Sequence, residues 1–292
     1  MQSRNKIIFN RKIIPYLLIS PYLVFLLVFV LFPVFFCFFL TFHKWNIISP
    51  MRFIGFQNYT RLFHDRLFWK AIWNTVKFLI VNVPLQIVIA LSLAYLLSTQ
   101  VKMVSFFKST FFLPVIVSGV VIAILWQQFF SFDFGLFNRI LSFFNIPKQA
   151  WLNNPKIAIY SIAVMSAWKN VGLYIILFLI GLQSVPRAYY EAAEMEGASG
   201  FQQFIHITLP MINPTMFMIV VLSTIGAFSL FIEPYMLTGG GPLNETLSAI
   251  LYIYKQAFQY YNMGYSSTLG FFYALIIMFV VVIQKKLIEK EG

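Results

Sequence analysis

Acidic side chains are rare in this sequence, and three of them fall in one short stretch, EAAEMEGASG at residues 191–200. The chain has nine Asp and Glu residues in all, yet Glu191, Glu194 and Glu196 lie within six positions, separated by small residues. Glycine and alanine leave room for another backbone to come close. No nucleophile elbow and no HExxH pattern accompanies the carboxylates. This chemistry favours polar contact with another molecule over a reaction.

Local signals predict two short helices around these acids. Pro186 suits the first turn of a helix, and the residues after it are good helix formers. Gly197 and Gly200 break that helix. Ser199 followed three residues later by Gln202 predicts a capping box, which opens a second helix. We expect Pro210 and Pro214 to end the second helix.

The second helix carries an apolar stripe at helical spacing. Its residues are Phe201, Phe204, Ile205 and Leu209. An exposed stripe of this kind indicates a docking surface for another protein. The alternative is a loop that packs against the floor of its own helical bundle. Physical reasoning on the sequence leaves both interpretations open.

The composition predicts an all-α membrane protein. Of the 292 residues, 60% are hydrophobic and only 10% are charged, whereas soluble domains carry roughly 25% charged residues. A helix needs about 20 apolar residues to cross a bilayer. Six segments qualify, and we expect them to form one transmembrane domain over residues 1–292. The expected spans cover residues 13–42, 78–101, 109–132, 157–182, 214–232 and 268–283. The first should be kinked by Pro15, Pro21 and Pro33.

Basic residues set the expected orientation. The amino terminus carries Arg4, Lys6, Arg11 and Lys12 with no acid, which predicts that it is cytoplasmic. Six spans then place Lys285, Lys286 and Lys290 inside as well. Lys102, Lys108 and Arg187 fall on the same side, which makes ten basic residues inside against nine in the outside loops, so the orientation rests on the amino-terminal cluster. The acidic stretch then lies in a cytoplasmic loop, residues 183–213, between spans four and five.

Polar residues inside the spans are candidates for a transport path. Lys169 and Asn170 interrupt the fourth span, and an ionisable residue inside a membrane is a functional-site hypothesis by default. The alternative, which we favour, is that Lys169 pairs with a partner subunit or reaches a watery cavity without touching a substrate. Polar residues within spans also serve helix packing. The other polar candidates are Asn82, Gln86, Ser118, Gln127, Gln128, Ser223, Thr224 and Ser229.

Other familiar sites have no support in the sequence. There is no G-x-x-x-x-G-K-[ST] phosphate loop, so the chain is not itself an ATPase. The three histidines, His43, His64 and His206, lie in different loops without metal-ligand spacing. The single cysteine, Cys37, allows no internal disulfide. The basic residues are spread over many loops, which excludes a nucleic-acid face. Residues 246–261 could form an interfacial helix after the glycine-rich loop LTGGG at 237–241, which we expect to be flexible.

One motif resembles a known family. Glu191-Ala192-Ala193, then Gly197 after three residues, then Ile207-Thr208-Leu209-Pro210 after nine more, is similar to the EAA motif of permease subunits of bacterial ABC importers. The stretches FIGFQNYTRLF, FWKAIWNT and LTGGGPLNETLSAILYIYKQAF resemble the maltose, glycerol-3-phosphate and multiple-sugar branch. The resemblance covers nearly the whole chain. Glu196 departs from it, because that branch commonly has Asp there.

The resemblance implies both a mechanism and partners. Glu191, Ala192, Ala193 and Gly197 would form a coupling helix in a cleft of a cytoplasmic ATPase. The expected partners are a second homologous permease, two ATPase subunits that hydrolyse the ATP, and an extracytoplasmic sugar-binding protein. The chain itself would bind no cofactor and would lie in the bacterial plasma membrane with both termini cytoplasmic. The sequence does not name the sugar.

A sugar substrate adds two aromatic candidates. Aromatic rings commonly stack on sugars, so Trp126 and Trp168 join Lys169, Asn170, Asn82 and Gln86 as candidate path residues. Two other classes of protein compete with the importer. An ion-driven secondary transporter would show internal repeats and paired ionisable residues at the midplane, and Lys169 stands alone there in the sequence. A non-transporting membrane anchor would not need the full EAA pattern.

Overall fold

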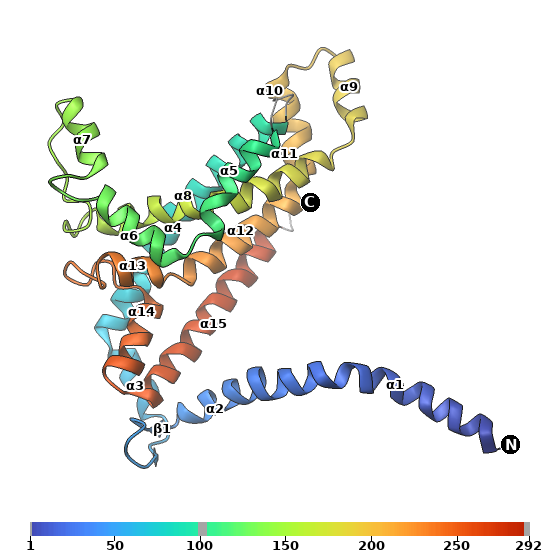
Figure 1. Cartoon of the computed structure of the whole chain (residues 1–292), viewed down its shortest axis with the longest axis vertical. Helices are drawn as coiled ribbons and strands as arrows, with labels where there is room; N and C mark the ends of the chain where they lie inside the picture. The colour runs from blue at the N-terminus through green and yellow to red at the C-terminus, as the bar shows by residue number, and fades with distance from the viewer. Residues whose placement is uncertain (1, 99–103, 289–292) are drawn as a thin grey trace. The chain divides into compact units, whose positions relative to one another are not determined.

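The computed structural model describes residues 2–98 and 104–288, and these residues are mostly helical (Figure 1). The expected end of the second span at Val101, and the basic residues Lys102 and Lys290, lie outside the described residues. The chain divides into two compact units. Unit 1 comprises Met1–His64 and Ile253–Phe272, and unit 2 comprises Asp65–Tyr252 and Tyr273–Gly292.

Unit 1 begins with the first apolar helix. It consists of α1 (Gln2–Leu26), a π-helical turn η1 (Leu27–Leu31) and α2 (Phe32–Leu40). Pro33 lies in the first turn of α2, directly after the π-helical turn. Proline has no N–H to donate to the preceding turn, and a local π-helical turn accommodates that loss. Residues Ile14–Leu40 are long and apolar enough to cross a membrane.

The rest of unit 1 surrounds a small hairpin. Strands β1 (His43–Lys44) and β2 (Arg52–Phe53) pair antiparallel, with His43 opposite Phe53 and Lys44 opposite Arg52. The buried amide of Asn58 donates hydrogen bonds to the carbonyls of Thr41 and His43, at 2.8 and 3.0 Å. The other helical elements with residues in unit 1 are α3 (Gln57–His64), α14 (Ala249–Tyr254), the π-helical η3 (Lys255–Gln259) and the start of α15 (Met263–Ile288).

Unit 2 is organised around two long helices, α4 (Arg66–Ser98) and α8 (Ala158–Gln183), which pack along each other. Helix α4 begins twelve residues before the span that we expected to start at Phe78, so Lys70 and Lys77 belong to it. Small side chains at Ala90 and Ala94 of α4 are fully buried. Helix α8 occupies the expected fourth span. The other elements of unit 2 are α5 (Val104–Ile116), α6 (Gly119–Phe129), α7 (Leu136–Phe143), α9 (Arg187–Met195), α10 (Gly200–Gln203), η2 (Phe204–Thr208), α11 (Leu209–Met211), α12 (Asn213–Phe228) and α13 (Ile232–Leu237).

The segment expected as the third span, residues 109–132, is not one straight helix. Helices α5 and α6 meet at an angle of 97° across Val117 and Ser118. Ser118 has the extended backbone of a helix N-cap (φ −51°, ψ 130°), so the helical bonding stops there. Across the described residues, five helices are long and apolar enough to span a membrane, and the bent pair gives a sixth if it is one span.

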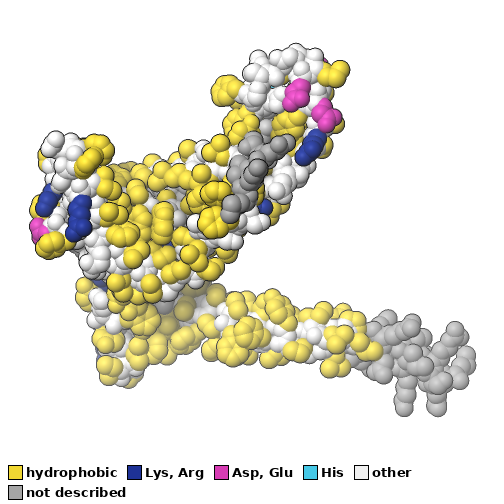
Figure 2. All heavy atoms as spheres, turned by 45° about the horizontal axis from the view of Figure 1, so that its top comes forward, with side chains coloured by type: hydrophobic (Ala, Val, Ile, Leu, Met, Phe, Trp, Pro, Cys, Tyr) yellow, Lys and Arg dark blue, Asp and Glu magenta, His cyan; other side chains and the backbone are white. Residues whose placement is uncertain are grey.

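The outer surface of the helices is largely hydrophobic, as expected for a protein surrounded by lipid. Figure 2 shows this on one face, where charged side chains gather on a few segments instead of being spread evenly. The acidic side chains of the α9 segment are among them. Polarity therefore concentrates at the places where a partner or water can reach the protein.

Candidate functional site

The EAA stretch forms a short exposed helix in unit 2. Helix α9 follows α8 after a three-residue turn, with Pro186 at its N-cap position. Glu191, Ala192 and Gly197 are exposed, and Ala193 is partly buried. Met195 projects furthest, with 90% of its surface exposed. In Figure 1, α9 stands with α10 at the end of the unit where α8 ends and α12 begins. The residues that carry the motif thus form an accessible surface.

Gly197 sits at a defined turn that requires glycine. Its backbone N–H bonds to the carbonyl of Glu194 at 3.0 Å, and the N–H of Ala198 bonds to the carbonyl of Ala193 at 2.9 Å. These two bonds make a Schellman motif, in which the residue after the helix adopts a left-handed conformation. Gly197 has φ +80°, a backbone conformation that glycine adopts without steric cost, at the point where the sequence predicted the helix to break. A Cβ added there would meet no atom within 4 Å, so the constraint is the backbone angle itself.

The second helix of the loop is held on the bundle. Ser199 and Gln202 form the predicted capping box, with the Ser199 N–H donating to Gln202 Oε1 at 2.7 Å. The hydroxyls of Tyr190 and Thr208 share a hydrogen bond of 2.9 Å that joins α9 to η2. Phe204 packs edge-on against Tyr95 of α4, with ring centroids 4.9 Å apart.

The expectation that Pro210 ends the second helix is wrong, whereas the helix does end at Met211, before Pro214. Pro210 lies in the first turn of α11, and Pro214 lies in the first turn of α12. Proline is favoured at this position because the N–H it lacks has no helical partner there. The apolar stripe is also split: Phe204 packs on the bundle, whereas Phe201 keeps 72% of its surface exposed and Ile205 keeps 40%. Part of the stripe therefore packs internally and part remains available to a partner.

The acids of the loop are not neutralised within the chain. In the described parts of the sequence, the ion pairs are those of Lys70 and Lys77 with Glu245 and of Lys169 with Glu233. Glu191, Glu194 and Glu196 are exposed and take part in none of them. This surface offers carboxylates and small residues to a molecule outside the chain.

A second candidate region is a cavity of about 260 Å³ inside unit 2. Four of the six predicted path residues line it: Asn82 and Gln86 from α4, and Lys169 and Asn170 from α8. Glu233 of α13 and Ser223 of α12 also contribute. On α4, Phe78, Asn82 and Gln86 recur every four residues, so helical geometry places them on one face. Segments far apart in the sequence therefore converge on one polar space.

The polar groups of this cavity are largely satisfied by one another. The buried amide of Asn82 donates to the carbonyl of Ala163 at 2.9 Å, and Ser223 Oγ donates to Gln86 Oε1 at 2.6 Å. Asn170 donates back to the carbonyl of Ser166 at 3.0 Å. Buried polar groups need such partners, because leaving one unpaired costs roughly 1–3 kcal/mol. The cavity is thus a preformed polar site within an apolar bundle.

Lys169 forms an ion pair that sequence reasoning missed. Its ammonium lies 3.4 Å from Glu233 Oε1, and the two side chains are only 15% and 10% exposed. We placed Glu233 at the end of the fifth span and expected Lys169 to pair with a partner subunit or to reach water. Because Lys169 pairs with Glu233 within the chain, the expectation that it pairs with a partner subunit is corrected. Gly119 makes room for it, because a Cβ there would lie 2.9 Å from Lys169 Nζ.

The two tryptophans are placed differently from the polar candidates. Trp126 is buried, with its ring centroid 5.4 Å from that of Trp168 and 5.3 Å from that of Phe130. Trp168 is 43% exposed. Neither residue lines the cavity. Both belong to an aromatic cluster with Phe137 and Trp151, where packing accounts for their positions.

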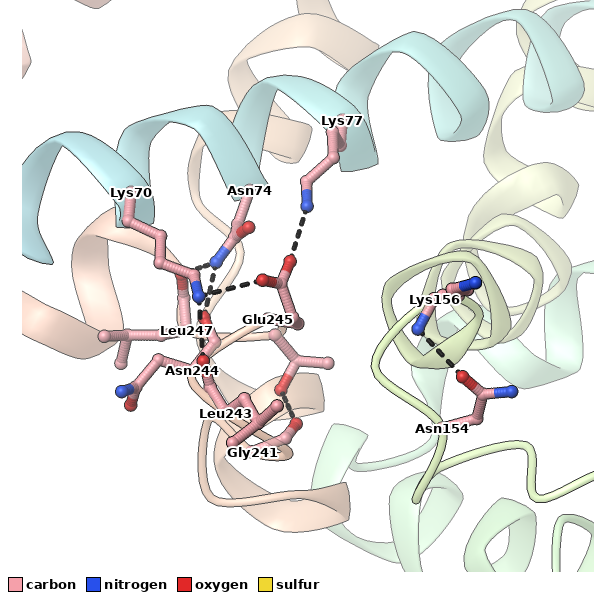
Figure 3. Close-up of polar contacts among 11 residues, drawn as sticks. Lys70, Asn74, Lys77, Asn154, Lys156, Gly241, Leu243, Asn244, Glu245 and Leu247 are labelled. Carbon is pink, nitrogen blue, oxygen red and sulfur yellow. Dashed lines mark hydrogen bonds and ion pairs between the residues drawn. The ribbon is translucent and has the colours of Figure 1, made fainter.

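The segment that follows the glycines of the LTGGG loop is anchored on α4. The carboxylate of Glu245 bridges Lys70 and Lys77 of α4, with both distances 2.8 Å (Figure 3). Asn74 of the same helix donates to the carbonyls of Asn244 and Leu247 at 2.7 and 3.1 Å. Hydrogen bonds from the two lysines hold the pKa of Glu245 below its ordinary value. We call residues 238–247 together with Lys70, Asn74 and Lys77 the loop clamp.

No further site of catalytic chemistry emerges from the described residues. They contain no group of three or more His, Cys, Asp or Glu side chains that could hold a metal ion. The side-chain nitrogens of His43, His64 and His206 each lie near a backbone carbonyl one turn earlier in the chain. Each histidine therefore has a local structural contact.

Comparison with known proteins places this chain among transport permeases. Residues 66–290 match the family described as binding-protein-dependent transport system inner membrane component. The probable ABC transporter permease protein YurN of Bacillus subtilis (strain 168) is 39% identical, over 95% of this chain and 96% of its own length. The arabinooligosaccharides transport system permease protein AraP of the same organism is 34% identical, over 96% and 90%. The trehalose/maltose transport system permease protein MalF of Thermococcus litoralis is 35% identical, over 89% and 87%.

Solved structures share the fold. A chain of a bacterial ABC transporter involved in the import of the acidic polysaccharide alginate has a TM-score of 0.82 at 24% identity, covering 98% of this chain and 99% of its own. A chain of a bacterial alginate ABC transporter in complex with alginate pentasaccharide-bound periplasmic protein has a TM-score of 0.80 at 25% identity, covering 94% and 93%.

The fold and the family match together define a multi-pass membrane permease of the ABC importer class, and not an enzyme. More specifically, the chain belongs to the binding-protein-dependent transport system inner membrane component family. Proteins of this family work with separate ATPase subunits.

Family membership also decides against an ion-driven secondary transporter. Lys169 is not the lone ionisable residue that the sequence suggested, because it pairs with Glu233, so its isolation is no ground against that class. The exclusion of an ion-driven secondary transporter rests instead on the family match over residues 66–290.

Proposed function

We propose that this chain is the transmembrane subunit of an ATP-driven importer for a sugar or an oligosaccharide. The observation that carries the proposal is the similarity to AraP and MalF, whose names state oligosaccharide or disaccharide transport. That similarity extends over about nine tenths of each chain. The two compact units would then work as one transmembrane domain of six spans, with α5 and α6 forming one bent span.

In this proposal the cavity of unit 2 lies on the substrate path. Asn82, Gln86, Lys169 and Asn170 line it, and Glu233 adds a carboxylate. Sugar hydroxyls both donate and accept hydrogen bonds, so amides and an ion pair are suitable partners for them. Trp126 and Trp168 would support this space through packing, without direct contact with the sugar.

The exposed loop is proposed as the coupling element. Its unpaired carboxylates, small residues and φ-positive corner at Gly197 support this role. Glu191 would make polar contacts with the cytoplasmic ATPase, while Ala192, Ala193 and Gly197 would allow the close approach of its backbone. ATP binding and hydrolysis on two partner subunits would then move this permease against a second, homologous permease. An extracytoplasmic binding protein would deliver the sugar.

The proposed orientation has both termini and the coupling loop in the cytoplasm of a bacterial cell, with the loop clamp outside. Single cysteines at Gly197, Arg61, Asn145 and Gly240, in a background lacking Cys37, test it by impermeant labelling of intact cells. We expect labelling from outside at all of these positions except Gly197. Labelling of position 197 from outside would overturn the orientation and the coupling role together.

The substrate class is tested on the assembled importer. The chain is co-expressed with a second permease, an ATPase and a binding protein encoded beside it, and the complex is purified. Lactose, maltose and arabinotriose are screened against the binding protein, and uptake of the bound sugar is measured in proteoliposomes. We expect ATP-dependent uptake of at least one neutral saccharide. A complex that assembles and transports only non-carbohydrate solutes would contradict the proposal.

A further inference from the structure

The hairpin end of unit 1 carries an unusual arrangement of charge. Lys44 of β1 lies directly opposite Arg52 of β2 in the antiparallel pair. Like charges at opposite positions of such a pair destabilise it. Arg61 of α3 adds a third cation, with its guanidinium 3.9 Å from the centroid of the Tyr265 ring. The geometry therefore concentrates positive charge where a counter-charge would be favourable.

No acidic residue of unit 1 can supply that counter-charge. Residues 1–64 and 253–272 contain no aspartate and no glutamate. Where side chains are described, none of the ion pairs involves Lys44, Arg52 or Arg61. An anion from outside the unit would relieve the repulsion.

A polar pocket of about 270 Å³ is lined by two of these cations, Lys44 and Arg61. Its lining includes Lys44, Trp45, Gln57, Asn58, Arg61 and Tyr265. Asn58 is buried, and its hydrogen bonds to Thr41 and His43 hold one wall in place. A Cβ at Gly264 would collide with the carbonyl oxygen of His43, so glycine permits the close packing of α15 against β1. The pocket is thus built on a braced backbone.

The sequence positions of the lining residues fix the depth of this pocket in a membrane. Lys44 comes four residues after Leu40, the last residue of the first candidate span. Tyr265 is the third residue of α15, whose candidate span begins at Met263. Both positions fall where an apolar span meets water. Basic and aromatic side chains at that level face the phosphates of the lipid headgroups.

We propose that this pocket binds the phosphate of an anionic lipid headgroup, with Lys44, Arg52 and Arg61 as the cationic ligands. Next to it, Ile48, Phe53 and Phe56 expose 88%, 73% and 70% of their surfaces. Apolar side chains beside a basic cluster are typical of a surface that lies in the headgroup region. This neighbourhood favours a lipid over a soluble anion or an acidic protein surface. In the proposed topology, the lipid belongs to the outer leaflet.

The test counts bound lipid on the full chain. The purified protein is reconstituted in vesicles of phosphatidylcholine alone or of equal parts phosphatidylcholine and phosphatidylglycerol, and retained lipid is measured by native mass spectrometry. The site variant is Lys44→Gln/Arg52→Gln/Arg61→Gln. The matched control is Arg139→Gln/Lys148→Gln/Lys156→Gln, which removes three exposed basic residues from unit 2. Gel-filtration profiles and melting temperatures confirm that the variants fold.

We expect one phosphatidylglycerol to be retained by the wild type and by the control. The site variant should bind it roughly a hundredfold more weakly, since each of the three cations near an anionic surface is worth about fivefold. Arg61→Lys, which keeps the charge, should retain the lipid. Equal retention by the site variant, or an equal loss in the control, overturns the proposal.

Two further outcomes would reassign the pocket. Displacement of the lipid by an equal concentration of inorganic phosphate would make it a free-anion site. If the site variant keeps its phosphatidylglycerol but loses stimulation of ATP hydrolysis by the binding protein, the cations instead serve an acidic protein surface. Neither result bears on the transport proposal, because uptake is measured separately.

Discussion

The coupling loop and the cavity of unit 2 are both polar regions of an apolar protein, but they are built in opposite ways. The loop is continuous in sequence, exposed, and leaves Glu191, Glu194 and Glu196 without ion pairs. The cavity is assembled from α4, α8, α12 and α13, and its main charge, Lys169, is already paired with Glu233. The loop is chemically incomplete without a partner, whereas the cavity is complete within the chain.

This difference teaches what a mutation should do in each region. A change in the cavity disturbs contacts inside the chain, so it should appear first as lost stability. A change in the loop disturbs contacts with another protein, so it should leave the folded subunit intact and appear as lost assembly or transport.

The largest effect is expected for Lys169→Met. The substitution leaves the carboxylate of Glu233 buried without its partner, which typically costs about 3–5 kcal/mol. The melting temperature of the purified subunit should fall strongly. The double variant Lys169→Met/Glu233→Leu should recover much of that loss, because no uncompensated charge remains. If single and double variants melt at the same low temperature, the ion pair is not what stabilises this region.

Gly197→Val should have the next largest effect, and it should act on function. A β-branched residue at φ +80° is strained by roughly 1–3 kcal/mol. We expect normal membrane levels, weak co-purification of the ATPase and loss of sugar uptake. Gly200→Ala is the matched control, since Gly200 lies in the same loop without a positive φ or a close neighbour.

Gly197→Asn separates the two possible reasons for a glycine. Asparagine tolerates the left-handed conformation, so the turn should form while a side chain is added to the exposed surface. If Asn restores ATPase binding, the backbone angle is what matters; if it does not, close approach by the partner matters as well. A Gly197→Val importer that assembles and transports like the wild type would show that this loop is not the coupling element.

Glu191→Ala should act in the same direction with a smaller effect. The change removes polar contacts to the ATPase without adding strain, and one lost hydrogen bond is worth about 1 kcal/mol. ATPase affinity should fall by up to about tenfold, while the melting temperature of the isolated subunit stays unchanged. A matched Glu194→Ala variant shows whether the effect is specific to the motif position. A drop in subunit stability instead would place Glu191 among internal contacts.

The sequence predicted the loop far better than the cavity. The capping box at Ser199 and Gln202 and the end of the helix at Gly197 each depend on residues a few positions apart. Rules of local sequence therefore predict both features. The pair of Lys169 and Glu233 joins positions 64 residues apart, and nothing in the local pattern of either helix reveals the other. Only the packing of α13 near α8 brings them together.

The broken third span lies between these extremes. Pro114, Ser118 and Gly119 flank the bend between α5 and α6, so a local signal was present. Apolar composition alone still predicted one continuous segment, because hydropathy carries no information about the direction of the helix axis. The loop clamp had a similar partial signal, because Lys70 and Lys77 are two turns apart on the same face of a helix. Their partner Glu245, however, is distant in sequence.

The smallest effect is expected at the loop clamp. The pKa of Glu245 is lowered by hydrogen bonds from Lys70 and Lys77, so its contribution is present above the ordinary carboxyl pKa and is lost as the pH falls through the lower folded value. Protection of residues 238–247 against hydrogen exchange, measured relative to the intrinsic rate at each pH, should therefore be constant near neutral pH and should fall only in acid. The ion pairs are worth up to about 1 kcal/mol each.

Glu245→Gln should reproduce the acid behaviour at neutral pH and abolish its pH dependence. Glu194→Gln, on the unpaired surface of α9, is the control and should leave exchange in the clamp unaltered. Faster exchange in the wild type already at neutral pH would mean that the clamp does not hold the loop in solution.

The buried pair of Lys169 and Glu233 also has an electrical consequence. Moving one elementary charge through a membrane potential of 100 mV costs or releases about 2.3 kcal/mol. An isolated lysine in the middle of α8 would tie any movement of that helix across the bilayer to the voltage of the cell. Because the carboxylate accompanies it at 3.4 Å, the two charges cancel and the moving segment carries no net charge. A movement that carries both residues together across the bilayer would then gain or lose no energy from the membrane voltage through this pair.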